Sequence, residues 1–450
     1  MQLVNGPGSA AFNAAGALPN GGQGVKIAIL DTGIDQNHPS LRDSGVEAPG
    51  GFLPVCDPKK PYACSNPDFT NGKVIVARSY VVPLAAGTNP ANPAIDSRPD
   101  DYTPRDREGH GTAVATVAAG GPSTGAITIS GMAPRAWLGN YKIFGSPLVN
   151  DVTFADIEIS ALEDAIRDGM DVISLSSGGF ALTGPLDTGA ACGLAAGLPC
   201  DPAAAAFEAA ARQGVVIVAA AGNEGYSGYL SSGNTPTYNS ITSPGDGPSL
   251  ITVGGITNSH ALGTAVRVTG AGVPASLNAI FAVASDSQGN RIATTAPLLD
   301  AAQLGNDGYA CQPLRSGSLV GKFALIQYSP PPQGICNFQA KFNNAVNAGA
   351  IGMVFYDYPD DAAWPYTPDG LSAFSLPAIM IGNADGVSLK SFLATRPGVS
   401  VTLDPFGIEL DVSNNGKPWN QLVGYSSVGP ATGTNGLKPE VLAEIGRAHV

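Results

Sequence analysis

Charged side chains are scarce in this 450-residue sequence: they make up 13% of it, and the formal net charge is −13. A phosphate backbone or an anionic membrane surface is bound by clustered lysine and arginine, and the sequence has no such cluster. No apolar run reaches the roughly 18 residues that a transmembrane helix needs. The sequence therefore argues against nucleic acid and membrane as partners.

Histidine is also rare, with four in total, and none of the six cysteines forms a C-x-x-C pair, which argues against a zinc site. The cysteines fall into three locally spaced pairs: Cys56 and Cys64, Cys192 and Cys200, and Cys311 and Cys336. Six cysteines allow roughly 15 connectivities, so pairing between neighbours is a preference. Disulfides indicate an oxidising compartment, and we expect a secreted protein. The first residues, MQLVNGPGSAAFNAAG, do not resemble a signal peptide.

Short apolar runs alternate with helical patterns over the first part of the chain. The strand-like runs are VKIAIL (25–30), VISLS (172–176), VVIVAAAG (215–222) and LITVGGI (250–256), and the helical stretches follow His110 or span 155–169 and 202–214. This alternation predicts an α/β fold with a parallel sheet. In such sheets, functional groups gather at the carboxyl ends of the strands.

The composition changes after about residue 257, where Thr, Ser, Ala and Gly dominate. GKFALIQY, NFQAKFNNAVNAGA, IGMVFYDY and LPAIMIGNADGVSLKSFLA then predict a compact strand, helix, strand, strand, helix unit with its own cysteine pair. We predict a first domain over 1–257, a smaller inserted α/β domain over 258–408, and a return to the first domain over 409–443.

Three polar residues stand at similar structural junctions. Asp31 ends a strand in AILDTGID, His110 begins a helix in REGHGTAVATVAAG, and Asn223 follows a strand in AAAGNEG. Histidine beside a buried aspartate is a general-base arrangement, and an asparagine amide can donate to an oxyanion. A second DTG at Asp187 raises the alternative of a two-aspartate protease, but no β-branched strand flanks it.

The three motifs, in this order, resemble the subtilisin-like serine peptidases over 24–257 and 408–443. The resemblance implies a three-layer domain and a secreted endopeptidase that acts on protein or peptide substrates and requires no cofactor for its chemistry. It also implies that Asp31 and His110 belong to an Asp-His-Ser triad and that Asn223 forms the oxyanion hole. ISLSSGG resembles the family's edge strand that pairs with the substrate backbone. The implied substrate-binding residues are Ser176, Ser177, Gly178, Ala219, Ala220, Ala221 and Gly222.

Residues 310–395 resemble a protease-associated (PA) domain. In relatives such a domain lies between the oxyanion asparagine and the nucleophile, as the order of motifs places it here. The resemblance implies an influence on substrate access or on contacts with partner proteins. An extra packed module without a recognition role is an equally simple interpretation.

The sequence departs from the family at several positions. Ala113 stands where many relatives carry a second histidine, Ser177 replaces a common leucine, and Ser40 replaces a calcium-binding aspartate. An acidic loop offers oxygen ligands for a structural calcium ion, although we favour a solvated loop and assign no metal ligand. Its residues are Asp96, Asp100, Asp101, Asp106 and Glu108.

The sequence contains no Gly-Thr-Ser-Met-Ala-like nucleophile motif. GPSTG (121–125) matches G-x-S-x-G, but it follows a helical stretch, so we expect Ser123 in a turn. The chain would then be an inactive peptide-binding homologue, use a nucleophile on another chain, or end before its nucleophile. We favour the last, because KPEVLA (438–443) precedes the nucleophile helix in relatives. The tail EIGRAHV (444–450) matches the translation of a common sequencing adapter, so we expect the domain to be incomplete.

Overall fold

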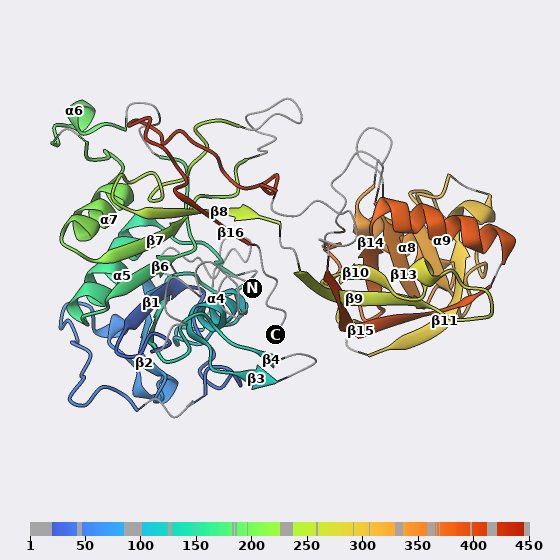
Figure 1. Ribbon diagram of the computed structural model, residues 1–450, viewed down its shortest axis with the longest axis horizontal. Helices are drawn as coiled ribbons and strands as arrows, with labels where there is room; N and C mark the ends of the chain where they lie inside the picture. Colours follow the sequence, from blue (N-terminus) through green and yellow to red (C-terminus); the bar gives the residue numbers. More distant parts are fainter. Residues whose placement is uncertain are drawn as a thin grey trace, which may run out of the picture. The chain divides into compact units, whose positions relative to one another are not determined.

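The computed structural model divides the chain into two compact units (Figure 1). The first unit comprises 1–257 and 421–450, and the second comprises 258–420. The described residues are 20–42, 47–84, 101–124, 128–147, 149–181, 184, 187–195, 197–225, 237–257, 260–290, 292–305, 307–328, 336–357, 365, 367–368, 370–396, 398–411 and 421–444. No helix in these ranges is long and apolar enough to cross a membrane.

The first unit is built on a seven-stranded sheet in which every strand pair is parallel. The strand order is β16-β8-β7-β6-β1-β5-β2. The strands are β1 (Lys26–Asp31), β2 (Val74–Ser79), β5 (Trp137–Lys142), β6 (Val172–Leu175), β7 (Val216–Ala220), β8 (Ile251–Ile256) and β16 (Val441–Glu444). The predicted α/β class and the four predicted strands are confirmed.

Helices cover both faces of this sheet, because successive strand residues point to opposite sides. In β1, Ala28 and Leu30 belong to the hydrophobic cluster of α5 (Ala155–Arg167) and α7 (Pro202–Arg212). Ile29, between them, packs with Ala115 of α4 (His110–Ala119). The three predicted helices are confirmed.

Strand β5 was not predicted from the sequence, because WLGNYK contains the polar residues Asn140 and Lys142 and lacks the apolar run of a buried strand. Its buried Asn140 donates to the Pro104 carbonyl oxygen at 2.8 Å, and the buried Lys142 ammonium donates to the Thr32 carbonyl oxygen at 2.6 Å. Tertiary hydrogen bonds therefore make a polar strand compatible with an interior position of the sheet, between β1 and β2.

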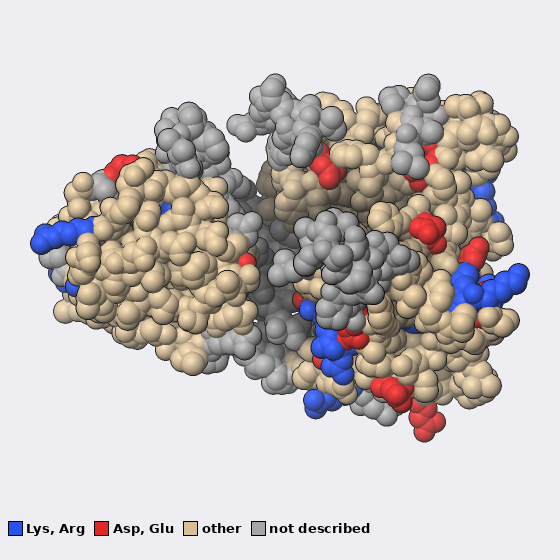
Figure 2. Space-filling view, turned by 180° about the vertical axis from the view of Figure 1, so that it is seen from behind, with Lys and Arg blue, Asp and Glu red and all other residues tan. Residues whose placement is uncertain are grey.

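The second unit contains a closed barrel with the strand order β10-β14-β13-β12-β11-β15-β9. The strands are β9 (His260–Val268), β10 (Ile280–Ala284), β11 (Thr294–Asp300), β12 (Phe323–Gln327), β13 (Gly352–Tyr356), β14 (Ala378–Ile381) and β15 (Ser400–Asp411), with helices α8 (Phe338–Asn347) and α9 (Asn383–Thr395). The five predicted elements are present as β12, α8, β13, β14 and α9, whereas β9, β10, β11 and β15 were missed. Uncharged side chains predominate on the face of this unit seen in Figure 2.

The end of the second unit lies further along the chain than the sequence suggested. Strand β15 continues past 408 to Asp411, which pairs with His260 of β9. The predicted boundary at 408 therefore cuts through a strand. In the adapter-like tail, Glu444 is the last residue of β16, and 445–450 lie outside the described residues.

All three locally spaced cysteine pairs are disulfides: Cys56–Cys64, Cys192–Cys200 and Cys311–Cys336. The predicted pairing preference is confirmed. The smaller elements of the described chain include α3 (Val81–Leu84), α6 (Gly189–Cys192), and a hairpin of β3 (Ser123–Thr124) and β4 (Thr128–Ile129). Ser123 lies in this hairpin, not in the turn that we predicted.

Candidate active site

Asp31 and His110 are in direct contact at the carboxyl edge of the first unit's sheet. Asp31 is the last residue of β1, and its Oδ1 lies 2.7 Å from His110 Nδ1. The Asp31 side chain is 1% exposed and the imidazole 51%. A carboxylate accepts from Nδ1–H, so it fixes the tautomer in which Nε2 has a free lone pair. The pair has the geometry of an oriented general base.

The close approach of α4 to β1 depends on glycine. A Cβ at Gly111 would lie 2.2 Å from the carbonyl oxygen of Gly33, so a larger residue would push His110 away from Asp31. Gly109, the N-cap of α4, has φ of +100°, a region that favours glycine. The glycines that flank His110 in the sequence motif therefore have a steric explanation.

Asp106 fixes the loop that leads into α4. Its carboxylate accepts hydrogen bonds from Thr32 Oγ1 (3.0 Å), Glu108 N (2.9 Å), Gly109 N (2.8 Å), Thr112 N (2.9 Å) and Thr112 Oγ1 (2.6 Å). Burial opposes ionisation, but these hydrogen bonds prevail and lower the pKa of Asp106. Asp106, one of the five acids of the loop for which no metal ligand was assigned, thus holds the backbone on both sides of His110.

The pKa of His110 is expected to lie above its ordinary value of 6.5. The hydrogen bond to Asp31 is the main cause; burial opposes it, and the charges of Asp31, Glu108 and Asp106 add to it. His38 provides an internal reference, because burial lowers its pKa below 6.5. In a ¹H NMR titration we expect His110 to titrate above pH 6.5 and His38 below it.

The sign of the shift can be tested in the same titration. Glu108→Gln removes a negative charge near the imidazolium, so it should lower the pKa of His110 and leave that of His38 unchanged. A His110 that titrates below His38, or that ignores Glu108→Gln, would contradict the assigned electrostatics.

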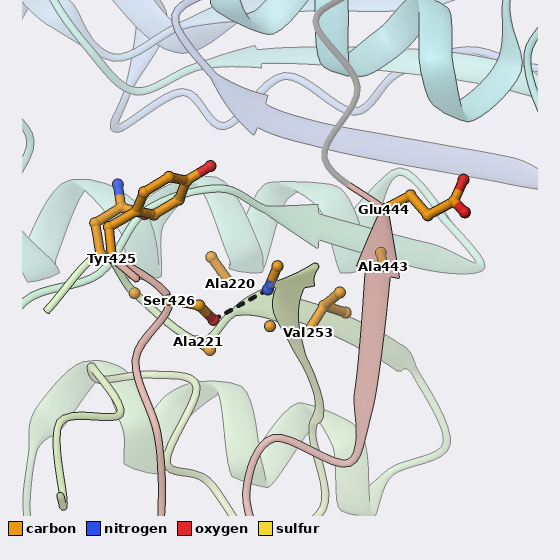
Figure 3. Close-up of a pocket in the computed structure, with 11 residues that line it drawn as sticks. Ala220, Ala221, Val253, Tyr425, Ser426, Ala443 and Glu444 are labelled. Atoms are coloured by element: carbon orange, nitrogen blue, oxygen red, sulfur yellow. Dashed lines mark hydrogen bonds between the residues drawn. The ribbon is translucent and has the colours of Figure 1, made fainter. Parts of the chain in front are cut away.

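Asn223 lies beyond the carboxyl end of β7, at the same sheet edge as Asp31. Strand β6 separates β7 from β1, so with a spacing of about 4.8 Å the two strand ends are roughly 10 Å apart. Asn223 is exposed and lines a pocket of about 230 Å³ together with Ala220, Ala221 and Gly222 (Figure 3). The other lining residues are Val253, Gly254, Gly255, Tyr425, Ser426, Ala443 and Glu444. Ala219 is buried and is not part of this lining.

The segment after β6 contacts the segment that follows β7. A Cβ at Gly178 would lie 2.2 Å from Thr242 Oγ1, and a Cβ at Gly222 would lie 2.6 Å from Thr242 Cγ2. Thr242 therefore packs against both glycines. Ser176 is half-buried, as is Ser177, but Ser177 Oγ donates to Glu158 Oε1 at 2.6 Å. The Ser177 hydroxyl is thus bound to α5.

Asp187 and two buried serines near the pocket, Ser426 and Ser427, make hydrogen bonds to the backbone. Asp187 Oδ1 accepts from the backbone N–H of Cys200 and of Asp201, beside the Cys192–Cys200 disulfide. Ser426 Oγ accepts from Gly255 N at 3.0 Å, and Ser427 Oγ accepts from Glu224 N at 3.0 Å. Both serines are buried. These contacts support the sheet edge and hold the loop after Asn223.

The described part of the chain contains no group of three or more His, Cys, Asp and Glu side chains arranged to hold a metal ion. Within the acidic loop, Asp101 accepts from Thr103 and Arg107, and Asp106 binds as described above. Asp96 and Asp100 lie outside the described residues. Ser40 is buried.

The chain belongs to the subtilase family, peptidase S8, whose family model matches residues 22–447. Members of this family are serine endopeptidases.

The chain is 30% identical over 394 residues to subtilisin-like protease SBT2.1 of Arabidopsis thaliana, which covers 80% of this chain and 41% of the relative. It is 27% identical over 482 residues to subtilisin-like protease SBT2.3 of the same plant, and this match covers 95% of this chain and 50% of the relative. A psychrophilic subtilisin-like protease from an Antarctic Pseudoalteromonas is 15% identical, with a TM-score of 0.45 over 92% of this chain and 80% of that one. The chain spans about half the length of the curated relatives it matches.

Proposed function

We propose that this protein is a secreted serine endopeptidase in which Asp31 and His110 are two members of an Asp-His-Ser triad. The observation that carries the proposal is the 2.7 Å contact between the buried Asp31 carboxylate and His110 Nδ1 at the carboxyl edge of a parallel sheet. Family membership supports the same reaction class. The three disulfides support export to an oxidising compartment.

In the proposed reaction, His110 Nε2 takes the proton of the serine hydroxyl as that oxygen attacks the scissile carbonyl. The imidazolium then gives the proton to the leaving amine, while Asp31 stabilises the positive charge through Nδ1–H. Water then attacks the acyl-enzyme ester, with His110 taking the water proton and returning it to the serine oxygen, so peptide-bond hydrolysis by this route requires no cofactor. We assign no serine of the printed sequence as the nucleophile, because none lies in a nucleophile motif and no hydroxyl among the described residues is hydrogen bonded to His110.

The substrate backbone is proposed to lie along Ser176 to Gly178 and past Ala220 to Gly222. Asn223 is exposed beside them and is free to turn its amide toward a developing oxyanion. Ala219 acts only by supporting this segment from within the sheet. The second unit is proposed to be a PA-like domain that contacts substrates or partner proteins. Its seven-stranded barrel contributes no residue to the Asp31–His110 contact.

We expect Asn223→Ala to lower kcat by about 10² to 10³, the size seen for the oxyanion asparagine of a subtilisin. The amide would bind the oxygen only when it carries developing charge, so KM should stay unchanged. Steady-state kinetics with a fluorogenic peptide measure both values. A rise in KM at constant kcat would mean that Asn223 binds the ground state instead.

The rival function is that of a non-catalytic protein whose cleft captures peptides. One experiment distinguishes a peptidase from a peptide-binding protein. The coding sequence is read again from genomic DNA, and the protein that it encodes is assayed for peptide hydrolysis with and without a fluorophosphonate. A peptidase should hydrolyse the peptide and lose that activity with the reagent. A binding protein should retain the peptide intact. Because members of a triad act as a unit, the 450-residue chain by itself is expected to show no appreciable turnover.

A two-aspartate protease would behave differently, since it would ignore the fluorophosphonate and lose activity on Asp187→Asn. The contacts of Asp187 with the backbone of Cys200 and Asp201 favour a structural role for this residue.

A further inference from the structure

Glu158 is a buried carboxyl group with few partners. It lies in the first turn of α5 and is 6% exposed. Its Oε1 accepts a hydrogen bond from Ser177 Oγ at 2.6 Å. Its Oε2 has no hydrogen-bond partner among the described residues and is not fully enclosed. One oxygen of a largely buried acid thus remains available to a ligand.

Glu208 of α7 shows how this protein satisfies a buried glutamate that has a purely structural role. Its side chain is also buried, yet it accepts from Arg212 Nε at 2.6 Å and from both N and Oγ of Ser249 at 2.7 Å. Glu158 has one hydroxyl in place of these three donors, and no lysine or arginine of the described chain forms an ion pair with it. Burial of an unpaired acid costs stability, so its persistence calls for a function.

Two exposed aromatic side chains lie close in sequence to Glu158 and Ser177. Ser177, the partner of Glu158, lies in the segment assigned to the substrate backbone. Phe154 stands one helical turn before Glu158 and is 59% exposed, and Phe180, three residues after Ser177, is 55% exposed. Aromatic rings of this kind cover the aliphatic stem of lysine or arginine and attract its charge.

We propose that Glu158, together with Ser177, forms a subsite that selects peptides with lysine or arginine at a single position away from the scissile bond. The inference rests on the proposed peptidase function and adds its substrate class. The cation would bind Oε2 directly, and Ser177 would hold Oε1 and thereby orient the carboxyl group.

The pH dependence follows from burial, which raises the pKa of Glu158 to about 7. The Ser177 hydrogen bond opposes this shift, and the charge of Asp201, at the start of α7, adds to it. Glu158 is therefore neutral below about pH 7 and charged above it. Selection for a basic side chain should increase as the pH rises through this range.

The test uses a series of fluorogenic peptides, each with lysine or norleucine at one position, and the peptidase encoded by the gene. At one position we expect lysine to raise kcat/KM by about tenfold or more over norleucine, the effect of one charge-assisted hydrogen bond. Glu158→Gln should remove this ratio, Glu158→Asp should keep part of it, and Ser177→Ala should reduce it. The matched control is Glu163→Gln, on the exposed part of α5, which should leave the ratio unchanged.

A second experiment separates the subsite from the peptidase function. Dye-labelled versions of the lysine and norleucine peptides are bound to the 450-residue chain, and their binding is measured by fluorescence anisotropy. Lysine-selective binding to this chain that is lost in Glu158→Gln would support the subsite. If the protein encoded by the gene bound these peptides with the same selectivity but hydrolysed none of them, the subsite would stand and the peptidase function would be overturned. Hydrolysis with no lysine preference at any position would overturn the subsite and leave the peptidase function intact. A lysine preference that survives Glu158→Gln, or that does not change between about pH 6 and 8, would also overturn the proposed subsite.

Discussion

Replacing His110 by alanine is expected to lower kcat for peptide hydrolysis by a factor on the order of 10⁶, the size seen when the triad histidine of a subtilisin is removed. The physical reason is that a serine hydroxyl is a weak nucleophile unless a base removes its proton during the attack. His110 Nε2 is the proposed base, because Asp31 occupies Nδ1 at 2.7 Å. The fold should be unaffected, since the imidazole is 51% exposed.

The measurement is single-turnover and steady-state kinetics on the peptidase encoded by the gene. His38→Ala is the matched control: it removes another partly buried histidine of the first unit that makes no contact with Asp31, and it should retain full activity. A His110→Ala variant with more than about one hundredth of the wild-type kcat would show that His110 is not the general base.

Asp168→Ala is expected to lower the free energy of unfolding of the first unit by about 3 to 5 kcal/mol. The Asp168 carboxylate forms a bidentate ion pair with Arg78 at 2.8 and 2.7 Å, and the two side chains are 0% and 1% exposed. It also accepts from Tyr141 Oη at 2.7 Å and from Val55 N at 3.2 Å. Removing it leaves a guanidinium buried without its counter-charge, which is the costly way to break such a pair.

Urea unfolding of the 450-residue chain, followed by circular dichroism, measures this loss. The control is Glu163→Ala, which removes a partly exposed ion pair with Lys60 and should cost less than about 1 kcal/mol. If the free energy of unfolding of Asp168→Ala were within about 1 kcal/mol of the wild-type value, the buried network would not contribute to the stability of the sheet.

The parts of the fold whose signal is local could be predicted from the sequence. β1, β6, β7 and β8 are short apolar runs, and α7 has an Asp201 N-cap followed by proline. β5 was missed because Asn140 and Lys142 are satisfied only by residues far along the chain. The barrel of the second unit was missed for a similar reason, since its closure depends on pairing of β9 with β10 and β15.

The candidate site divides in the same way. The contact between Asp31 and His110 could be anticipated, because each residue sits at the end of a recognisable element. The direction of the Ser177 side chain could not, since it depends on a glutamate 19 positions away on another element. The sequence shows Asp106 only as one of five acids in a loop. Its role in holding the backbone around His110 depends on the N–H groups of Gly109 and Thr112 that donate to it. The pairing of Arg78 with Asp168, 90 positions apart, carries no local signal at all.

The most direct test of the central claim is to locate the adduct that a fluorophosphonate forms with the protein encoded by the genomic locus. We predict one adduct, found by peptide mass spectrometry, on a serine in a Gly-Thr-Ser-like motif, and its formation should be abolished by His110→Ala. Peptide hydrolysis without any adduct, or an adduct whose formation does not depend on His110, would contradict the assignment of Asp31 and His110 to a serine peptidase triad.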